Sequence, residues 1–245
     1  MSFIKNKKVQ IFAVILSFIV LIFVVVFINY CAKRENYVTR PSKSEPEGFT
    51  FLNIGENTRF SDEIRDQLRD KLGSDAIESW NTLDLTLNYK GFLKKYFPPL
   101  YELNKKLNSP VGERVEHNTI RLTYRYARKK NVPFDYVELV FSNLTKKPLL
   151  FFIGIKKEGL DIIDTVTKKY GKASTINWTN KEGKSLYWKK NRSVLILSIS
   201  NDRYGHPKYQ TRIYYVPSLE ELVNSEQEKT KHHQEVIKKT GKIAF

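Results

Sequence analysis

The amino-acid sequence predicts an α+β protein with a single N-terminal transmembrane helix, antiparallel sheet with helices packed on one face, and a long C-terminal helix. Three observations lead to this fold class. An apolar run over residues 11–28 is long enough to cross a bilayer. Apolar and polar residues alternate in several later stretches, of which residues 120–126 are the clearest, and a period of two is typical of a strand. Ser218 and Glu221 have the spacing of a capping box, which marks the start of the last helix.

The apolar run predicts a retained membrane anchor. Residues 11–28 contain one polar side chain, Ser17, and a helix of this length covers roughly 27 Å, close to the ~30 Å hydrocarbon core of a bilayer. Cleavage as a signal peptide and lipidation of Cys31 are the alternatives. Both favour small residues before the cut, whereas Tyr30 is large. We therefore expect a short N-terminal tail at residues 1–8 and a transmembrane helix at residues 9–30.

The flanks of the span predict its orientation and a linker. Lysines and arginines are nearly balanced on its two sides, so the short lysine-bearing tail decides, and it favours a cytoplasmic N-terminus. Residues 31–48 are polar, contain two prolines and lack apolar periodicity, which predicts a flexible linker. The chain is thus predicted to be a single-pass protein of the cell (inner) membrane, with an α+β domain at residues 49–217 in the periplasm or another extracytoplasmic space.

The domain is expected to open with a short helix. Ser61 is a favourable N-cap, and Gly73 is suited to a left-handed C-terminal cap. Between them Ile64, Leu68 and Leu72 recur every four residues and form one apolar stripe.

Alternation of leucines with polar residues over 83–89 then predicts a strand. Residues 92–97 have a helical pattern, which Pro98 and Pro99 interrupt. A new helix is expected to begin at Pro99, because proline is favoured in the first helical turn.

Most of the remaining chain has the pattern of antiparallel strands. Strands are predicted near residues 120–126, 135–142, 149–155, 174–178, 185–189, 193–200 and 211–216, and a helix at residues 159–170 that ends at Gly171. In the first of these strands Arg121 and Arg125 point away from the apolar side, which predicts a basic outer face.

Two similar spacings predict an internal repeat. Lys105, Lys106 and Leu107 end one expected helix, and an aromatic pair begins seventeen residues later at Tyr124; Lys168, Lys169 and Tyr170 end another, and an aromatic pair again begins seventeen residues later, at Tyr187. We interpret this as two tandem helix-plus-sheet units, near residues 99–155 and 159–217, with chance similarity as the alternative.

The C-terminal segment, residues 218–245, is predicted to be a helix that docks only at its beginning. Leu219, Leu222 and Val223 provide an apolar first part, after which residues 224–235 contain no apolar side chain. An apolar tail follows, and its candidate partner-binding residues are Val236, Ile237, Ile243 and Phe245.

A strong positive charge is the second candidate basis for binding. The chain has 42 lysines and arginines against 26 acidic residues, a formal net charge of +16. Solubilising surface charge is one explanation; a field that attracts anionic lipid or another polyanion is the other. The candidate anion-binding residues are Arg121, Arg125, Arg128, Lys129, Lys130, Lys189, Lys190 and Arg192. Nucleic acid is not expected, since the tyrosines beside Arg121 and Arg125 face the core and cannot stack on bases.

The sequence has no recognisable catalytic signature. It lacks a nucleophile elbow, a phosphate-binding P-loop, a dinucleotide fingerprint and a zinc-protease motif, so no catalytic residue, cofactor or metal site is predicted. We therefore expect a membrane-anchored, non-enzymatic interaction or assembly module, a subunit or accessory factor of a cell-envelope complex with a protein partner. The alternatives are a basic domain that binds anionic lipid or cell-wall polymer, and an enzyme whose site has no linear motif.

Overall fold

The computed structural model describes residues 48–77, 81–125, 132–156, 161–179 and 182–244, without the side chains of residues 76, 77, 234 and 241–244. Within these ranges no helix combines the length and apolar character needed to cross a bilayer. The predicted tail and transmembrane helix, and all of the predicted linker but Gly48, lie outside the described residues.

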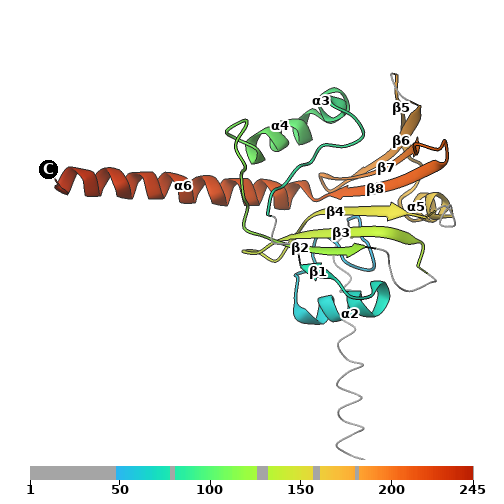
Figure 1. Ribbon diagram of the computed structural model, residues 1–245, viewed down its shortest axis with the longest axis horizontal. Coiled ribbons are helices and arrows are strands. Elements are labelled where there is room, and N and C mark those ends of the chain that lie inside the picture. Colours follow the sequence, from blue (N-terminus) through green and yellow to red (C-terminus); the bar gives the residue numbers. More distant parts are fainter. Residues whose placement is uncertain (1–47, 78–80, 126–131, 157–160, 180–181, 245) are drawn as a thin grey trace, which may run out of the picture. The chain divides into compact units, whose positions relative to one another are not determined.

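A single antiparallel sheet of eight strands forms the centre of the described chain (Figure 1). The strand order is β1-β2-β3-β4-β8-β7-β6-β5, and every neighbouring pair is antiparallel. The strands are β1 (Ala76–Ile77), β2 (Thr119–Arg125), β3 (Phe134–Ser142), β4 (Pro148–Ile155), β5 (Ser174–Asn177), β6 (Gly183–Lys190), β7 (Ser193–Asn201) and β8 (Pro207–Tyr214). The α+β class is thus confirmed.

The helices cover both faces of this sheet, so the expectation that they pack on one face is wrong. They are α2 (Asp62–Leu72), α3 (Phe92–Tyr96), α4 (Pro98–Leu107), α5 (Ile162–Tyr170) and α6 (Val216–Ala244). We call face A the side on which α3, α4 and the start of α6 pack against Val140, Leu150 and Ile196. Face B is the opposite side, on which α2 and α5 pack against Phe151 and Leu195.

The register of the strands explains why both faces are buried. Six apolar residues lie directly opposite one another from β2 to β6 and form one row on face B: Leu122, Leu139, Phe151, Ile213, Leu195 and Trp188. Their neighbours in sequence point to face A, as the period of two requires. In β4 these neighbours are apolar as well, so the strand is apolar on both sides.

Local signals in the sequence placed the short helices correctly. The Ser61 hydroxyl accepts a hydrogen bond from the Ile64 amide at 3.4 Å and caps α2. Gly73 and Gly171 end α2 and α5 with positive φ values of 93° and 84°, which glycine adopts without strain, but their ψ values of −169° and −170° lie outside the left-handed helical region, so the predicted left-handed cap at Gly73 is wrong. The two prolines divide α3 from α4, and α4 begins at Pro98.

The segment of residues 81–88, which we call the strap, is not the strand that its leucine pattern predicts. Its leucines are buried against face A, yet none of its residues belongs to a strand of the sheet. Side chains satisfy its backbone instead. The Asn104 amide oxygen accepts from Leu85 N at 2.8 Å, and the Tyr214 hydroxyl donates to Leu85 O at 2.9 Å. Arg121 and Arg212 donate to two further carbonyl oxygens, those of Thr82 and Thr86.

The sheet consists of two halves that meet in its middle. Helix α2 precedes β1 to β4, helix α5 precedes β5 to β8, and the last strands of the two halves, β4 and β8, pair with each other. Both helices lie on face B. The element order therefore makes α2, rather than the α4 of the predicted repeat, the counterpart of α5. Duplication of the sequence remains a prediction.

Helix α6 begins on face A and continues beyond it. It starts at Val216, two residues before the expected cap, with the Leu219 amide donating to Tyr215 O at 3.0 Å. Leu219 and Leu222 are buried, whereas residues from 227 onward are exposed wherever their side chains are described, and Figure 1 shows this part extending away from the sheet. Glu226 lies at the end of this packed part, with its carboxylate 2.8 Å from Nδ1 of the buried His117 in a partly buried contact.

Candidate functional site

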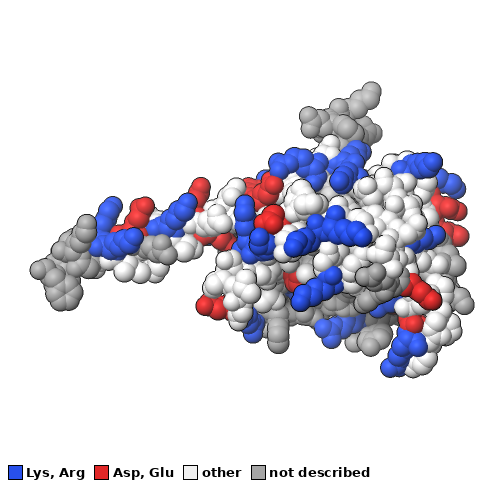
Figure 2. Space-filling view, turned by 90° about the horizontal axis from the view of Figure 1, so that it is seen from above, with Lys and Arg blue, Asp and Glu red and all other residues white. Residues whose placement is uncertain are grey.

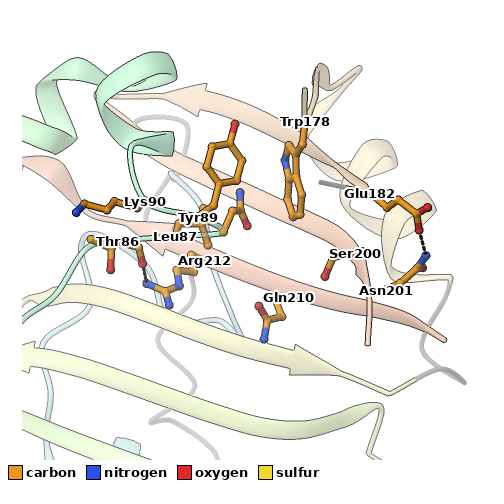
Figure 3. Close-up of a pocket in the computed structure, with 11 residues that line it drawn as sticks. Thr86, Leu87, Tyr89, Lys90, Trp178, Glu182, Ser200, Asn201, Gln210 and Arg212 are labelled. Carbon is orange, nitrogen blue, oxygen red and sulfur yellow. Dashed lines mark hydrogen bonds between the residues drawn. The ribbon is translucent and has the colours of Figure 1, made fainter. Parts of the chain in front are cut away.

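A groove on face A is one of the hollows that the described residues form. It has a volume of about 840 Å³ and is open to solvent. Four parts of the chain line it: the end of the strap and the turn after it, the β5–β6 connection, the end of β7, and the middle of β8. Its lining residues are Thr86, Leu87, Asn88, Tyr89, Lys90, Trp178, Glu182, Ser200, Asn201, Gln210 and Arg212 (Figure 3). We refer to it as the face-A groove.

One side of the groove is an aromatic wall whose position is fixed by hydrogen bonds. The Trp178 indole N–H donates to the Ser185 hydroxyl at 3.0 Å, and Asn88 donates to the same oxygen at 3.1 Å. Trp178 meets the Tyr89 ring edge to face, with centroids 5.9 Å apart. Burial raises the pKa of Tyr89, with a further contribution from its neighbour Tyr96, so its hydroxyl stays protonated over the ordinary pH range.

The floor of the groove is a surface of polar side chains on the sheet. Gln210 and Arg212 rise from β8 beside Ser200 of β7 (Figure 3). The Arg212 guanidinium lies 4.9 Å from the centre of the Phe152 ring and donates to Thr86 O. Arg212 is therefore held in place by contacts on two sides, and it ties the floor to the strap.

The two ends of the groove carry opposite charge. Glu182 lies at one end, where the Asn201 amide donates to its carboxylate at 3.0 Å, and Lys90 lies at the other end, beyond Thr86 (Figure 3). The amide side chains between them can both donate and accept hydrogen bonds. This arrangement favours an elongated ligand with a cation at one end and an anion at the other.

The groove lining holds no evident catalytic pair. Glu182 is paired with an amide rather than with a second carboxylate or a histidine, which general acid–base catalysis would need nearby. Within the described ranges no group of three His, Cys, Asp or Glu side chains could hold a metal ion. The lining is suited to binding, which is what its chemistry supports best.

Gly183 is required by the position of Trp178, which gives a testable prediction. A Cβ atom at residue 183 would lie 2.5 Å from two atoms of the Trp178 ring and 2.8 Å from Ile199 O. Gly183→Ala should displace the ring, red-shift tryptophan emission and lower the free energy of unfolding by about 1–3 kcal/mol. Gly205→Ala is the control, because it has a positive φ but no atom within 4 Å, so it should leave the emission unchanged. Unchanged emission in Gly183→Ala would contradict the fixed wall.

The structure separates the predicted anion-binding residues into different environments. Arg121 is largely buried, with 13% of its side chain exposed, and it lies 3.6 Å from Glu138 and donates to the strap, so its role is structural. Arg192 pairs with Glu220 at 2.7 Å. Arg125 is exposed at the end of β2 and has an interaction partner. The other members are Lys189 and Lys190, which line a second hollow, and Arg128, Lys129 and Lys130, which lie outside the described residues.

On the side of the molecule seen in Figure 2, the basic residues do not form one continuous face. Lysines and arginines occur there in several groups with acidic residues between them. The predicted basic outer face of β2 is thus reduced to Arg125, because the strap and Glu138 engage Arg121.

The predicted partner-binding tail is exposed where it is described. Val236 and Ile237 have 45% and 57% of their surface exposed on the part of α6 that extends from the sheet. The side chains of Ile243 and Phe245 lie outside the description. Partner binding by this tail remains a prediction.

Sequence reasoning did not identify the residues of the face-A groove. They come from four segments spread over residues 86–212, and none belongs to a motif. The one available signal was Trp178, a bulky aromatic residue just after a short edge strand and close to a glycine, Gly183.

The chain was also compared with known proteins. No family model matches it, and no curated protein and no solved structure matches it significantly.

Proposed function

We propose that this protein is a membrane-anchored, non-enzymatic recognition module that binds an extended polypeptide segment of a partner protein in the face-A groove. The observation that carries the proposal is the preorganised Trp178 wall above a floor of amide, hydroxyl and guanidinium groups. The partner would belong to a cell-envelope complex, and the domain would lie in the extracytoplasmic space next to the inner membrane.

The chemistry of the groove supports a peptide as the ligand. Side-chain amides such as Gln210 and Asn88 can pair with both the N–H and C=O groups of an extended backbone. A fixed aromatic ring such as Trp178 provides a large contact area at little cost in conformational entropy, and such residues dominate binding energy at interfaces. Glu182 and Lys90 at the two ends complement a segment with a basic and an acidic residue.

The membrane anchor in this proposal is supported by the sequence. The apolar run of residues 11–28 is the only one of its length in the chain, and the linker after it would let the domain reach partners near the bilayer. A tethered domain needs only moderate affinity, because anchoring raises the local concentration of a membrane-bound partner.

Selection from a random peptide display library tests this function. The full-length protein in neutral detergent should enrich peptides in which an acidic and a basic residue are separated by a short polar or aromatic stretch. Trp178→Ala should weaken the binding of these peptides about thirtyfold or more, since it removes the central aromatic contact.

Lys184→Gln is the matched control for this test. Lys184 is exposed on β6 next to Gly183 but does not line the groove, so its replacement should leave peptide affinity unchanged. Peptides that bind the Trp178→Ala variant as tightly as the original chain, or no enrichment at all, would refute the groove as a peptide site.

A further inference from the structure

A second hollow, away from the face-A groove, combines lysines with aromatic rings. It has a volume of about 530 Å³ and lies where the end of α5 meets the end of β6. Its cations are Lys172, Lys189 and Lys190, and no carboxylate is among the described residues that line it. The remaining lining is mostly aromatic and includes Tyr170 and Trp188.

The walls of this hollow are fixed by contacts of their own. The Trp188 indole N–H donates to Gly171 O at 2.8 Å, and the Tyr170 hydroxyl accepts from Thr50 N at 2.9 Å. The Lys189 ammonium lies 5.6 Å from the centre of the Phe97 ring, a distance that permits a cation–π contact. Lys189 lines the hollow, and its ammonium lies against a ring that packs on face A.

Two lysines of this hollow differ from other basic residues of the surface in that they have no acidic partner within the described ranges. Arg192 and Lys147 each pair with a glutamate of α6, at 2.7 and 2.6 Å. Lys172 and Lys189 have no ion pair with any carboxylate that the structure describes. The negative C-terminal end of the α5 dipole favours a lysine at position 172. The same dipole does not explain Lys189, because Lys189 belongs to β6.

We propose that this hollow binds a phosphate group. Lysine is a compact point charge with three donors, and lysines from two elements that line one hollow can offer several donors to the oxygens of a phosphate. Positive charges gathered at one hollow repel one another, and a bound dianion would relieve that repulsion. A lipid headgroup and a phosphate-bearing envelope polymer carry the same group, and the predicted anchor brings both within reach of the domain. The proposal is independent of peptide binding in the groove.

Titration of the full-length protein in neutral detergent tests the proposal. Trp188 lines the hollow, so its emission should change on binding. The probes are inorganic phosphate, dihexanoyl phosphatidylglycerol and poly(glycerol phosphate), and the phosphate-free comparison is poly-L-glutamate. We expect saturable binding of inorganic phosphate and tighter binding of whichever phosphate-bearing molecule is the natural source, the lipid or the polymer.

Single variants show whether the hollow itself is responsible. Lys172→Gln and Lys189→Gln should each weaken phosphate binding about tenfold, the usual effect of losing one charged hydrogen bond. Lys189→Arg should retain binding, since it keeps the charge. Lys184→Gln, which makes the same charge change on β6, should have no effect, and neither should Trp178→Ala in the groove. Equal binding of poly-L-glutamate, or an equal loss in Lys184→Gln, would overturn the proposal in favour of general attraction of anions.

Discussion

Replacing Phe151 with alanine should lower the free energy of unfolding by about 3–5 kcal/mol, the largest effect that we expect from a single substitution. Phe151 is fully buried in β4 at the centre of the sheet. Its ring packs edge to face against Phe141 and Tyr215, with centroids 5.5 and 5.1 Å away. Alanine would leave a cavity on face B, where the two halves of the sheet meet and the surrounding rings are themselves buried. Urea denaturation followed by circular dichroism measures the change.

The adjacent residue provides the matched control. Phe152 has the same chemistry and lies in the same strand, but it points to face A and is only partly buried. Phe152→Ala should cost clearly less than Phe151→Ala. If both variants lost the same free energy of unfolding, the claim that β4 is packed more tightly on face B than on face A would be wrong.

Replacing Tyr214 with phenylalanine should produce a stability difference that changes sign with pH. At neutral pH the variant should be less stable by about 1–2 kcal/mol, because Leu85 O of the strap loses the hydroxyl that donates to it at 2.9 Å. Burial raises the pKa of Tyr214 to about 12, whereas the unfolded chain has a value near 10.

The direction at high pH follows from linkage. Between pH 10 and about 12 the unfolded chain releases the Tyr214 proton and the folded protein retains it, so unfolding of the original protein becomes easier by about 1.4 kcal/mol per pH unit. Phenylalanine has no such proton, and the other tyrosines are common to both chains. Tyr214→Phe should thus become the more stable of the two near pH 12. A constant difference from pH 7 to pH 12 would contradict a buried, hydrogen-bonded Tyr214 hydroxyl.

Elements with local signals could be predicted from the sequence, and those that depend on distant partners could not. Helix α2 follows from Ser61, a stripe at intervals of four and Gly73, all within thirteen residues of one another. The strap has the same alternation of apolar and polar residues as a strand. Its backbone is hydrogen-bonded by side chains from β2, β8 and α4 and not by a neighbouring strand, and no local feature of the sequence indicates this.

A signal for two covered faces was present in the sequence. β4, Pro148–Ile155, contains no charged residue and is apolar on both sides, a pattern typical of strands buried on both faces. The alternating pattern of β2 describes only the strands near the edge of the sheet. There Arg121 and Arg125 point to face A, where Arg121 contacts the strap and Arg125 is exposed to solvent. The apolar sequence of β4 is thus the local signal for helices on both faces of the sheet.

The candidate binding sites depended almost entirely on the structure. Lys189 was among the expected anion-binding residues because it lies in a basic cluster of the sequence. Lys172 lines the same hollow only because the end of α5 lies next to β6 in the fold. Trp178 and Arg212 both line the face-A groove because the pairing of the strands and the position of the strap bring their segments together. Their separation in the sequence gives no indication of this proximity.

The most direct test of the central claim, a tethered domain that recognises a polypeptide in the face-A groove, is photo-crosslinking in native membranes. A photoreactive amino acid replaces Ser200 in the groove floor of the full-length protein, and mass spectrometry identifies the molecule attached to it. We predict that the chain stays in the membrane fraction and that a polypeptide is attached at residue 200 but not in a Trp178→Ala background. Recovery of the chain as a soluble fragment without its first thirty residues, or a residue-200 adduct that is not a polypeptide, would contradict the account.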